Sequence, residues 1–191
     1  MNHLPTWLAT IALLVVAGVV SSVTPADDAE VAPFIVTGEM GEPVTGRDIV
    51  ATVTDARTAT SVTGSAEWSD DEPWTAEGDW LVVDVDVASV TGPRIVYLSG
   101  AVVLDNAVFA LDGREYRATE RTPTMLDVRL NPGVPRHGSL AFELPALTGE
   151  GVLQLSVSSD TRMDSVLEIP IDLDALTPLT ETGIVEPEWV R

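Results

Sequence analysis

Apolar and polar residues alternate along several segments of this chain, and this pattern constrains the fold more than any other feature of the sequence. In Asp79–Ala88 the odd positions from 81 carry Leu or Val, while the even positions from 82 carry Val, Asp or Ala. Arg47–Arg57 alternates in the same way. A period of two places successive side chains on opposite faces of a strand. The sequence therefore predicts strands with one face turned to a core.

Turn signals divide the chain into short strands. Asp112-Gly113 interrupts the alternating segment Ala107–Ala118, and a two-residue hairpin turn favours this dipeptide because it needs positive φ values. Asn131-Pro132-Gly133 is a second turn by the same chemistry. Further strands are expected at Ile95–Leu98, Val102–Asp105, Met125–Leu130, Ser139–Leu144, Val152–Ser158 and Val166–Leu173. Many short strands separated by turns are typical of an all-β antiparallel sandwich.

The N-terminal part has a different character. Trp7–Val23 is an uncharged apolar run of about 17 residues, at the lower edge of what spans a bilayer as a helix. It is either an uncleaved anchor or a cleaved signal peptide. The missing basic residues in Met1–Thr6 favour the anchor. Acids soon after the run (Asp27, Asp28 and Glu30) agree with export of the C-terminal side.

These patterns give a domain organisation of four parts. Residues 1–24 form the membrane anchor or signal segment, and 25–33 form a linker without periodicity. Residues 34–176 form the β-sandwich domain. Residues 177–191 are expected as a C-terminal tail outside the sandwich.

The charge of the chain excludes several functions. Thirty acids stand against ten arginines and no lysine, so the formal net charge is -20. Nucleic-acid binding depends on basic residues that neutralise phosphates, and anionic lipid surfaces repel acidic ones, so both partners are disfavoured. With no cysteine there are no disulfides, thiol nucleophiles or lipid-modified cysteines. Arginine without lysine is typical of a GC-rich bacterial genome.

Few residues offer catalytic or metal-binding chemistry. His3 and His137 are the only histidines; His3 precedes the apolar run, and His137 reads as a surface loop residue. A histidine-based triad or a two-histidine metal site is therefore excluded. Asp84 and Asp86 share one strand face and could supply oxygen ligands to calcium, although solvated acids are the favoured interpretation. The loop acids considered in the same way are Asp70, Asp71 and Glu72. We assign no catalytic residue, no metal site and no cofactor.

The segment Glu67–Trp80 is rich in tryptophan and acids. Trp68 and Trp74 lie in its proline-containing part, which we expect to be a loop, and Trp80 opens the following strand. Exposed tryptophan in a loop often serves recognition. Packing is the favoured role, and Trp68 and Trp74 are the candidate binding residues if recognition occurs.

Three segments together resemble a known family: Gly78–Ser89 (GDWLVVDVDVAS), Phe109–Thr119 (FALDGREYRAT) and Leu130–Pro145 (LNPGVPRHGSLAFELP). Their order and spacing within Gly46–Ser158 are similar to those of bacterial extracytoplasmic domains of the DUF4352 type. The resemblance implies an immunoglobulin-like β-sandwich and a secreted or membrane-anchored location in Gram-positive bacteria. It also implies a binding or interaction role, and it carries over no active residue.

The sequence thus predicts an extracytoplasmic interaction or accessory module that is not an enzyme. It would be tethered as a single-pass membrane protein through residues 7–23, or secreted, with an envelope protein as its partner. Two alternatives remain. One is a module that binds a ligand or cation, and the other is a carboxylate-dependent hydrolase with two acids roughly 5 to 9 Å apart.

Overall fold

The computed structural model describes residues 6–23, 31–64, 73–90, 102–120, 123–145 and 147–190. The chain divides into two compact units, Met1–Ala32 and Pro33–Arg191. The first unit holds one helix, α1 (Thr6–Val23), with no acidic residue in its first turn and no basic residue in its last. Its apolar side chains are exposed, including Leu13 and Val15. In the described part of the chain, no helix has both the length and the hydropathy needed to cross a membrane.

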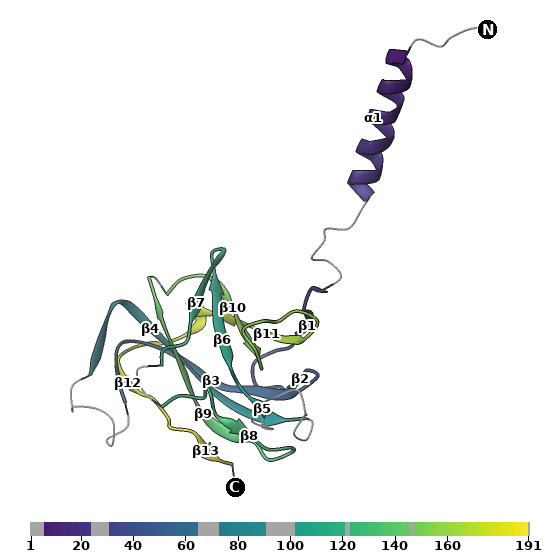
Figure 1. The fold of residues 1–191 in the computed structure, drawn as a ribbon. Helices are drawn as coiled ribbons and strands as arrows, with labels where there is room; N and C mark the ends of the chain where they lie inside the picture. Colours follow the sequence, from purple (N-terminus) through teal and green to yellow (C-terminus); the bar gives the residue numbers. More distant parts are fainter. Residues whose placement is uncertain are drawn as a thin grey trace. The chain divides into compact units, whose positions relative to one another are not determined.

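The second unit consists of two main β-sheets and one small strand pair (Figure 1). The first sheet has, in spatial order, β1 (Phe34–Thr37), β11 (Ser165–Asp172), β10 (Glu150–Ser156), β6 (Asn106–Leu111) and β7 (Arg114–Arg117). The second has β12 (Pro178–Gly183), β3 (Ile49–Thr63), β4 (Trp74–Ser89), β9 (Arg136–Leu144) and β13 (Glu188–Trp189), with β2 (Val44–Thr45) also paired to β3. The small pair is β5 (Val102–Val103) with β8 (Arg129–Leu130), and a 3-10 turn, η2 (Leu173–Ala175), follows β11.

The strand order is that of an immunoglobulin-like sandwich. The chain passes from the second sheet to the first after β4, and again after β9. Because β4 pairs with β9 and β6 with β10, both antiparallel, the strands form Greek-key connections between the sheets. Two edge pairings are parallel, β1 with β11 and β12 with β3. The predicted fold class, a β-sandwich preceded by one apolar helix, is confirmed.

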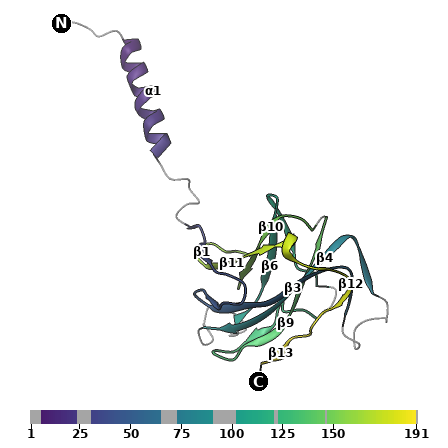
Figure 2. The same ribbon diagram turned by 180° about the vertical axis from the view of Figure 1, so that it is seen from behind.

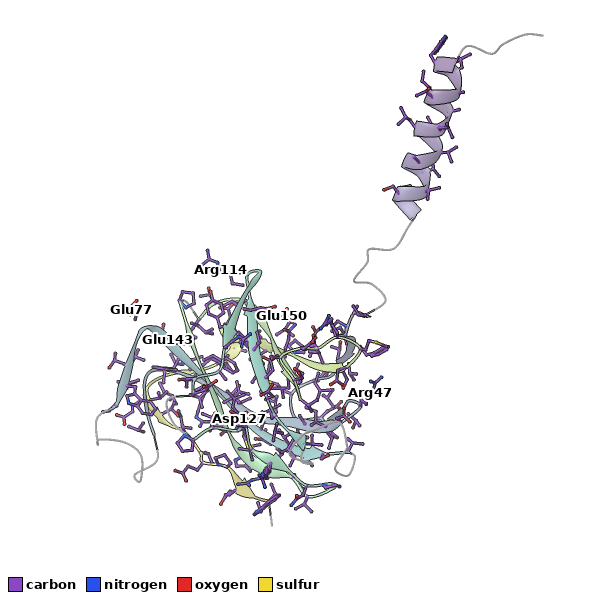
Figure 3. The ribbon with its side chains drawn as sticks, in the orientation of Figure 1. Arg47, Glu77, Arg114, Asp127, Glu143 and Glu150 are labelled. Atoms are coloured by element: carbon purple, nitrogen blue, oxygen red, sulfur yellow. The ribbon has the colours of Figure 1, made fainter. Side chains whose placement is uncertain are left out.

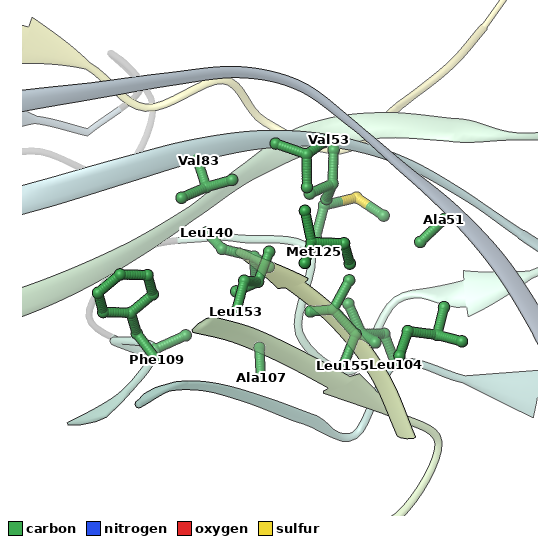
Figure 4. Packing of buried hydrophobic residues seen from close by; sticks show 14 of the residues in the cluster. Ala51, Val53, Val83, Leu104, Ala107, Phe109, Met125, Leu140, Leu153 and Leu155 are labelled. Carbon is green, nitrogen blue, oxygen red and sulfur yellow. The ribbon is translucent and has the colours of Figure 1, made fainter. Parts of the chain in front are cut away.

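The core lies between the two sheets, where the alternating residues place their apolar side chains. Leu81, Val83, Val85 and Val87 of β4 are each fully buried. Figure 4 shows side chains of both sheets meeting in this layer, with Phe109 of the first sheet near the second. Its ring centroid lies 5.9 Å from that of Phe142. Burying each such side chain stabilises the fold by about 1.5–3 kcal/mol.

The predicted hairpin turn is confirmed. Leu111 pairs with Arg114 across the turn between β6 and β7. Asp112 has a φ of 51° and Gly113 a φ of 73°. Both values lie in the left-handed region that a primed two-residue turn requires.

The outer face of the second sheet is more buried than expected, because the sequence predicted only one face of β4 as core. Trp80 and Val82 are 1% and 0% exposed and form a second apolar cluster with Val62, Ala141 and Ile184. The segment after β12 covers them. The expectation that only one face of β4 is core is therefore incomplete.

The C-terminal segment belongs to the sheet rather than to a tail. β12 lies beside β3 (Figure 2) and pairs with it from Pro178 to Gly183. The chain then crosses the outer face, since Ile184 N–H donates to Thr63 O and the backbone of Val185 bonds Ser139. β13 pairs with the far strand, β9. The described part of the predicted tail, residues 177–190, thus belongs to the second sheet because these hydrogen bonds and Ile184 hold it there.

Candidate functional site

Polar side chains that could bind a ligand or take part in catalysis lie together on the outer face of the second sheet. Asp84 and Asp86 alternate on β4, and the register pairs them with Ser139 and His137 of β9. A period of two puts all four on the same face. Along β4, this row follows Trp80 and Val82, which belong to the second apolar cluster.

Asp84 is held in a buried polar network. Its side chain is 11% exposed, and its Oδ2 accepts a hydrogen bond from Arg57 Nη1 at 2.5 Å. Its Oδ1 accepts one from Ser139 Oγ, also at 2.5 Å. Ser139 Oγ in turn accepts from the Val185 N–H at 2.8 Å. Asp84 and Ser139 are thus engaged in holding strands and the C-terminal segment together.

Arg57 extends this network to β12. Its Nε donates to Thr182 Oγ1 at 2.7 Å and its Nη2 to Gly183 O at 2.9 Å. A weaker contact joins its Nη1 to Asp55 Oδ2 at 3.2 Å. A planar guanidinium that satisfies several acceptors fixes their relative positions. Arg57 therefore fastens β12 to β4.

His137 forms a separate pair with Asp86. The sequence placed this histidine in a loop, but it lies in β9, and its Nδ1 is 2.7 Å from Asp86 Oδ1. The side chains are 29% and 30% exposed, so both reach solvent. An ionised carboxylate only accepts, so Nδ1 is the donor in this contact.

An open groove of about 580 Å³ lies over this pair. Its walls come from β3, β4, β9 and β13. The residues that line it are Thr54, Asp86, His137, Glu188, Trp189 and Val190. A second hollow of about 250 Å³ shares Asp86 and is lined by Val50, Thr52, Asp86, Ala88, Gly133 and Pro135. We call the two together the outer groove.

Arg136 positions the C-terminal wall of the outer groove. Its guanidinium carbon lies 4.5 Å from the centre of the Trp189 ring, and its Nη2 donates to Pro187 O at 2.7 Å. Val190 N–H donates to Pro135 O at 3.1 Å. The Trp189 side chain nonetheless stays 41% exposed. The indole is thus held in place with surface available to a partner.

A serine hydrolase needs a serine hydroxyl and a histidine base side by side, but here the two groups have different partners. Ser139 Oγ bonds Asp84, whereas His137 bonds Asp86. A serine nucleophile requires a base within hydrogen-bond reach of its own oxygen. The Ser139 hydroxyl instead bonds the Asp84 carboxylate and the Val185 N–H, so its contacts hold the C-terminal segment in place.

One of the two β4 carboxylates considered as calcium ligands is already engaged in an ion pair. Asp84 is neutralised by Arg57, so Asp84 and Asp86 do not act as a pair of free carboxylates. Within the described ranges, no three or more His, Cys, Asp or Glu side chains are grouped as metal ligands. The loop acids considered for calcium, Asp70, Asp71 and Glu72, lie outside the described residues.

The two tryptophan candidates are not part of the outer groove. Trp68 lies outside the described residues. Trp74 was expected in a loop, but it is the first residue of β4, pairs with Val62 and packs half-buried against the second apolar cluster. Its partner on β3, Val62, lies ten positions along that strand from Thr52, the partner of Asp86. Trp189 is the groove's tryptophan, and its position in a predicted tail gave no sign of this role.

Comparisons with known proteins add one structural likeness. No family model matches the chain, so none supports the DUF4352 type. No curated protein is significantly similar to it. Among solved structures, it is similar to an uncharacterised β-sandwich protein from Clostridium difficile 630, with 11% identity and a TM-score of 0.46 over 78% of this chain and 100% of that one. The assignment as a β-sandwich rests on the strand order above.

Proposed function

We propose that this chain is an exported interaction module that contacts an envelope protein through the outer groove. The observation that carries the proposal is the groove itself, where an exposed, positioned Trp189 stands beside Asp86, His137 and Glu188. Tryptophan is enriched at the residues that dominate protein interfaces. Polar groups around such an anchor supply orientation and specificity.

A binding role fits the contacts better than catalysis does. The most buried carboxylate on this face, Asp84, and the neighbouring Ser139 hydroxyl both hold the C-terminal segment. Asp86, His137 and Trp189 around the groove remain open to solvent. They can accept hydrogen bonds and contact apolar groups, which is sufficient for recognition.

Export is supported by the character of α1. Apolar residues cover the helix, and exposed ones include Leu13 at 69% and Leu14 at 68%. A helix that is apolar all round normally lies in a nonpolar environment. The helix belongs to a compact unit of its own, Met1–Ala32. We infer that the segment directs the chain to the membrane, as an anchor or as a signal peptide.

Export is tested by expressing the chain in a Gram-positive host and measuring its intact mass in each cell fraction. Full mass in the membrane fraction, or loss of about 22 residues with release to the medium, supports export. Full mass in the cytosol contradicts it. A variant lacking residues 7–23 is the control and should remain in the cytosol.

Use of the outer groove is tested separately by photo-crosslinking in intact cells. A benzophenone amino acid replaces Thr54, which lines the groove, or Glu150, which is exposed at the start of β10 in the other sheet (Figure 3). We expect an adduct with an envelope protein at position 54 only. Equal adducts at both positions, or none at position 54, would overturn the role of the groove.

A further inference from the structure

We propose that the outer groove binds a cationic side chain, and that it prefers the planar guanidinium of an arginine presented by the partner. This inference rests on the proposed function, because it names the chemistry of the partner. It follows from the charges, free acceptors and apolar surface that the groove brings together.

Two carboxylates flank one imidazole in the groove. The register pairs Asp86 with His137 across β4 and β9, and His137 with Glu188 across β9 and β13. None of the lining residues is a lysine or arginine. The nearby guanidinium of Arg136 is engaged with Trp189 and Pro187 O. The groove therefore presents two carboxylates and no lysine or arginine among its lining residues.

These groups retain hydrogen-bond capacity. His137 contacts only Oδ1 of Asp86, so Oδ2 receives no hydrogen bond from the described residues. Glu188 forms no ion pair within the same part of the chain and is exposed. The hydroxyl of Thr54 donates to Asp84 O, which leaves its oxygen able to accept. A guanidinium carries five N–H donors in one plane and matches such a set of separated acceptors.

The apolar wall suits the rest of an arginine side chain. Trp189 and Val190 are 41% and 40% exposed at the edge of the groove. The Trp189 ring already accepts one guanidinium, that of Arg136, at 4.5 Å. Stacking of a guanidinium or its aliphatic stem on an aromatic ring is favourable. A strongly hydrated ammonium gains less from this surface, which is the basis of the preference.

The size and the surrounding charge are consistent with this ligand. The larger hollow, about 580 Å³, falls within the range of about 300–1,000 Å³ typical of small-ligand sites. The hollow that shares Asp86 offers Val50, Ala88 and Pro135 to the residues beside the bound arginine. The net charge of -20 attracts cationic segments from a distance and speeds their association.

The experiment titrates the ¹⁵N-labelled full chain, in non-ionic detergent, with the blocked tripeptide acetyl-Gly-Arg-Gly-amide. The signals followed are the Trp189 indole N–H, assigned by its loss in Trp189→Phe, and the backbone N–H groups of His137 and Val190. We expect saturable shifts at these positions. The same peptide with citrulline, which is neutral and of similar shape, should bind at least about tenfold more weakly, as expected for loss of a charge-assisted contact.

Matched variants separate the groove from the overall charge. Glu188→Gln and Glu150→Gln each remove one negative charge, but only Glu188 lines the groove. We expect Glu188→Gln to weaken binding about fivefold and Glu150→Gln less than about twofold, since an exposed distant charge contributes little.

Three results would overturn the inference: equal losses in both variants, equal binding of the citrulline peptide, or no saturable shift. Equal binding of a lysine peptide would overturn the preference for guanidinium. If the crosslink at position 54 persists while arginine fails to bind, the interaction role stands and only the ligand chemistry is wrong.

Discussion

Arg57 and Asp84 form the ion pair whose loss should destabilise the sandwich most. Their side chains are 17% and 11% exposed. Removing one partner of a buried pair leaves a charge without compensation, which typically costs about 3–5 kcal/mol. Because some water reaches this pair, we expect Arg57→Met to lower the free energy of unfolding by about 3 kcal/mol. Urea unfolding of the full chain in non-ionic detergent measures this.

Arg162 provides the matched control. It pairs with Asp160 at 2.7 Å, but the two side chains are 70% and 59% exposed. Arg162→Met should leave the unfolding midpoint unchanged within error, because solvent screens an exposed pair. If Arg57→Met costs no more than Arg162→Met, the network around Asp84 does not hold the C-terminal segment.

The same exposed pair gives a prediction about pH. Hydrogen bonds to the Asp160 carboxylate, chiefly from the Arg162 side chain and next from the Arg162 backbone N–H, lower the pKa of Asp160 from 3.8 to about 2. Since the folded pKa is depressed, any contribution to stability is present above about pH 4 and is lost as the pH falls toward 2. We expect Arg162→Met to return the pKa toward 3.8. Carboxyl ¹³C shifts measured against pH test this, and an unchanged pKa in the variant would show another cause.

Among the elements, the C-terminal segment should contribute to stability as a strand does. Ile184 is 7% exposed and packs against Trp80 and Val82. Truncating a buried isoleucine costs about 2–5 kcal/mol, and we expect about 2 kcal/mol for Ile184→Ala at this sheet face. Leu179→Ala, on β12 at 41% exposure, should cost less than about 1 kcal/mol. Urea unfolding compares the two, and equal small effects would mean that the segment is only loosely attached.

Local patterns predicted strands of both sheets, β4 and the hairpin of β6 and β7 among them, but not what covers them. The alternation in β4 and the Asp112-Gly113 turn depend on neighbours in sequence, so both could be read directly. The outer cluster depends on Ile184 meeting Trp80, residues about a hundred positions apart. Nothing near Pro178 indicates that it pairs with β3 in parallel. The tail prediction failed because the partner of this segment is distant in sequence.

The candidate site was missed for a related reason. Pro135 and Gly138 around His137 suggested a turn, yet β9 runs from Arg136 to Leu144. A Cβ at Gly138 would lie 3.0 Å from Met125 Cγ and 3.2 Å from Pro187 Cα. Gly138 is therefore required by close packing within a strand, not by a turn. Only the register of β4 with β9 shows that His137 meets Asp86.

At the scale of the whole molecule, charge repulsion opposes the compact sandwich. Thirty acids against ten arginines leave a net charge of -20. Self-repulsion among surface carboxylates destabilises a compact state, and salt weakens it. The Debye length falls from about 30 Å at 0.01 M to about 10 Å at 0.1 M salt. The buried Arg57–Asp84 pair is screened much less, so the net effect of salt should be stabilising.

We therefore expect the melting temperature to rise by about 3–6 °C between 0.01 and 0.3 M sodium chloride, which corresponds to about 1–2 kcal/mol for a chain of this size. A variant combining Glu39→Gln, Glu115→Gln and Glu150→Gln removes three exposed charges and should show a smaller rise. Calorimetry in non-ionic detergent measures both proteins. A melting temperature that is flat or falls with salt would mean that ion pairs, rather than repulsion, dominate the surface. The attraction of the outer groove for cationic partners would then have to come from its own residues alone.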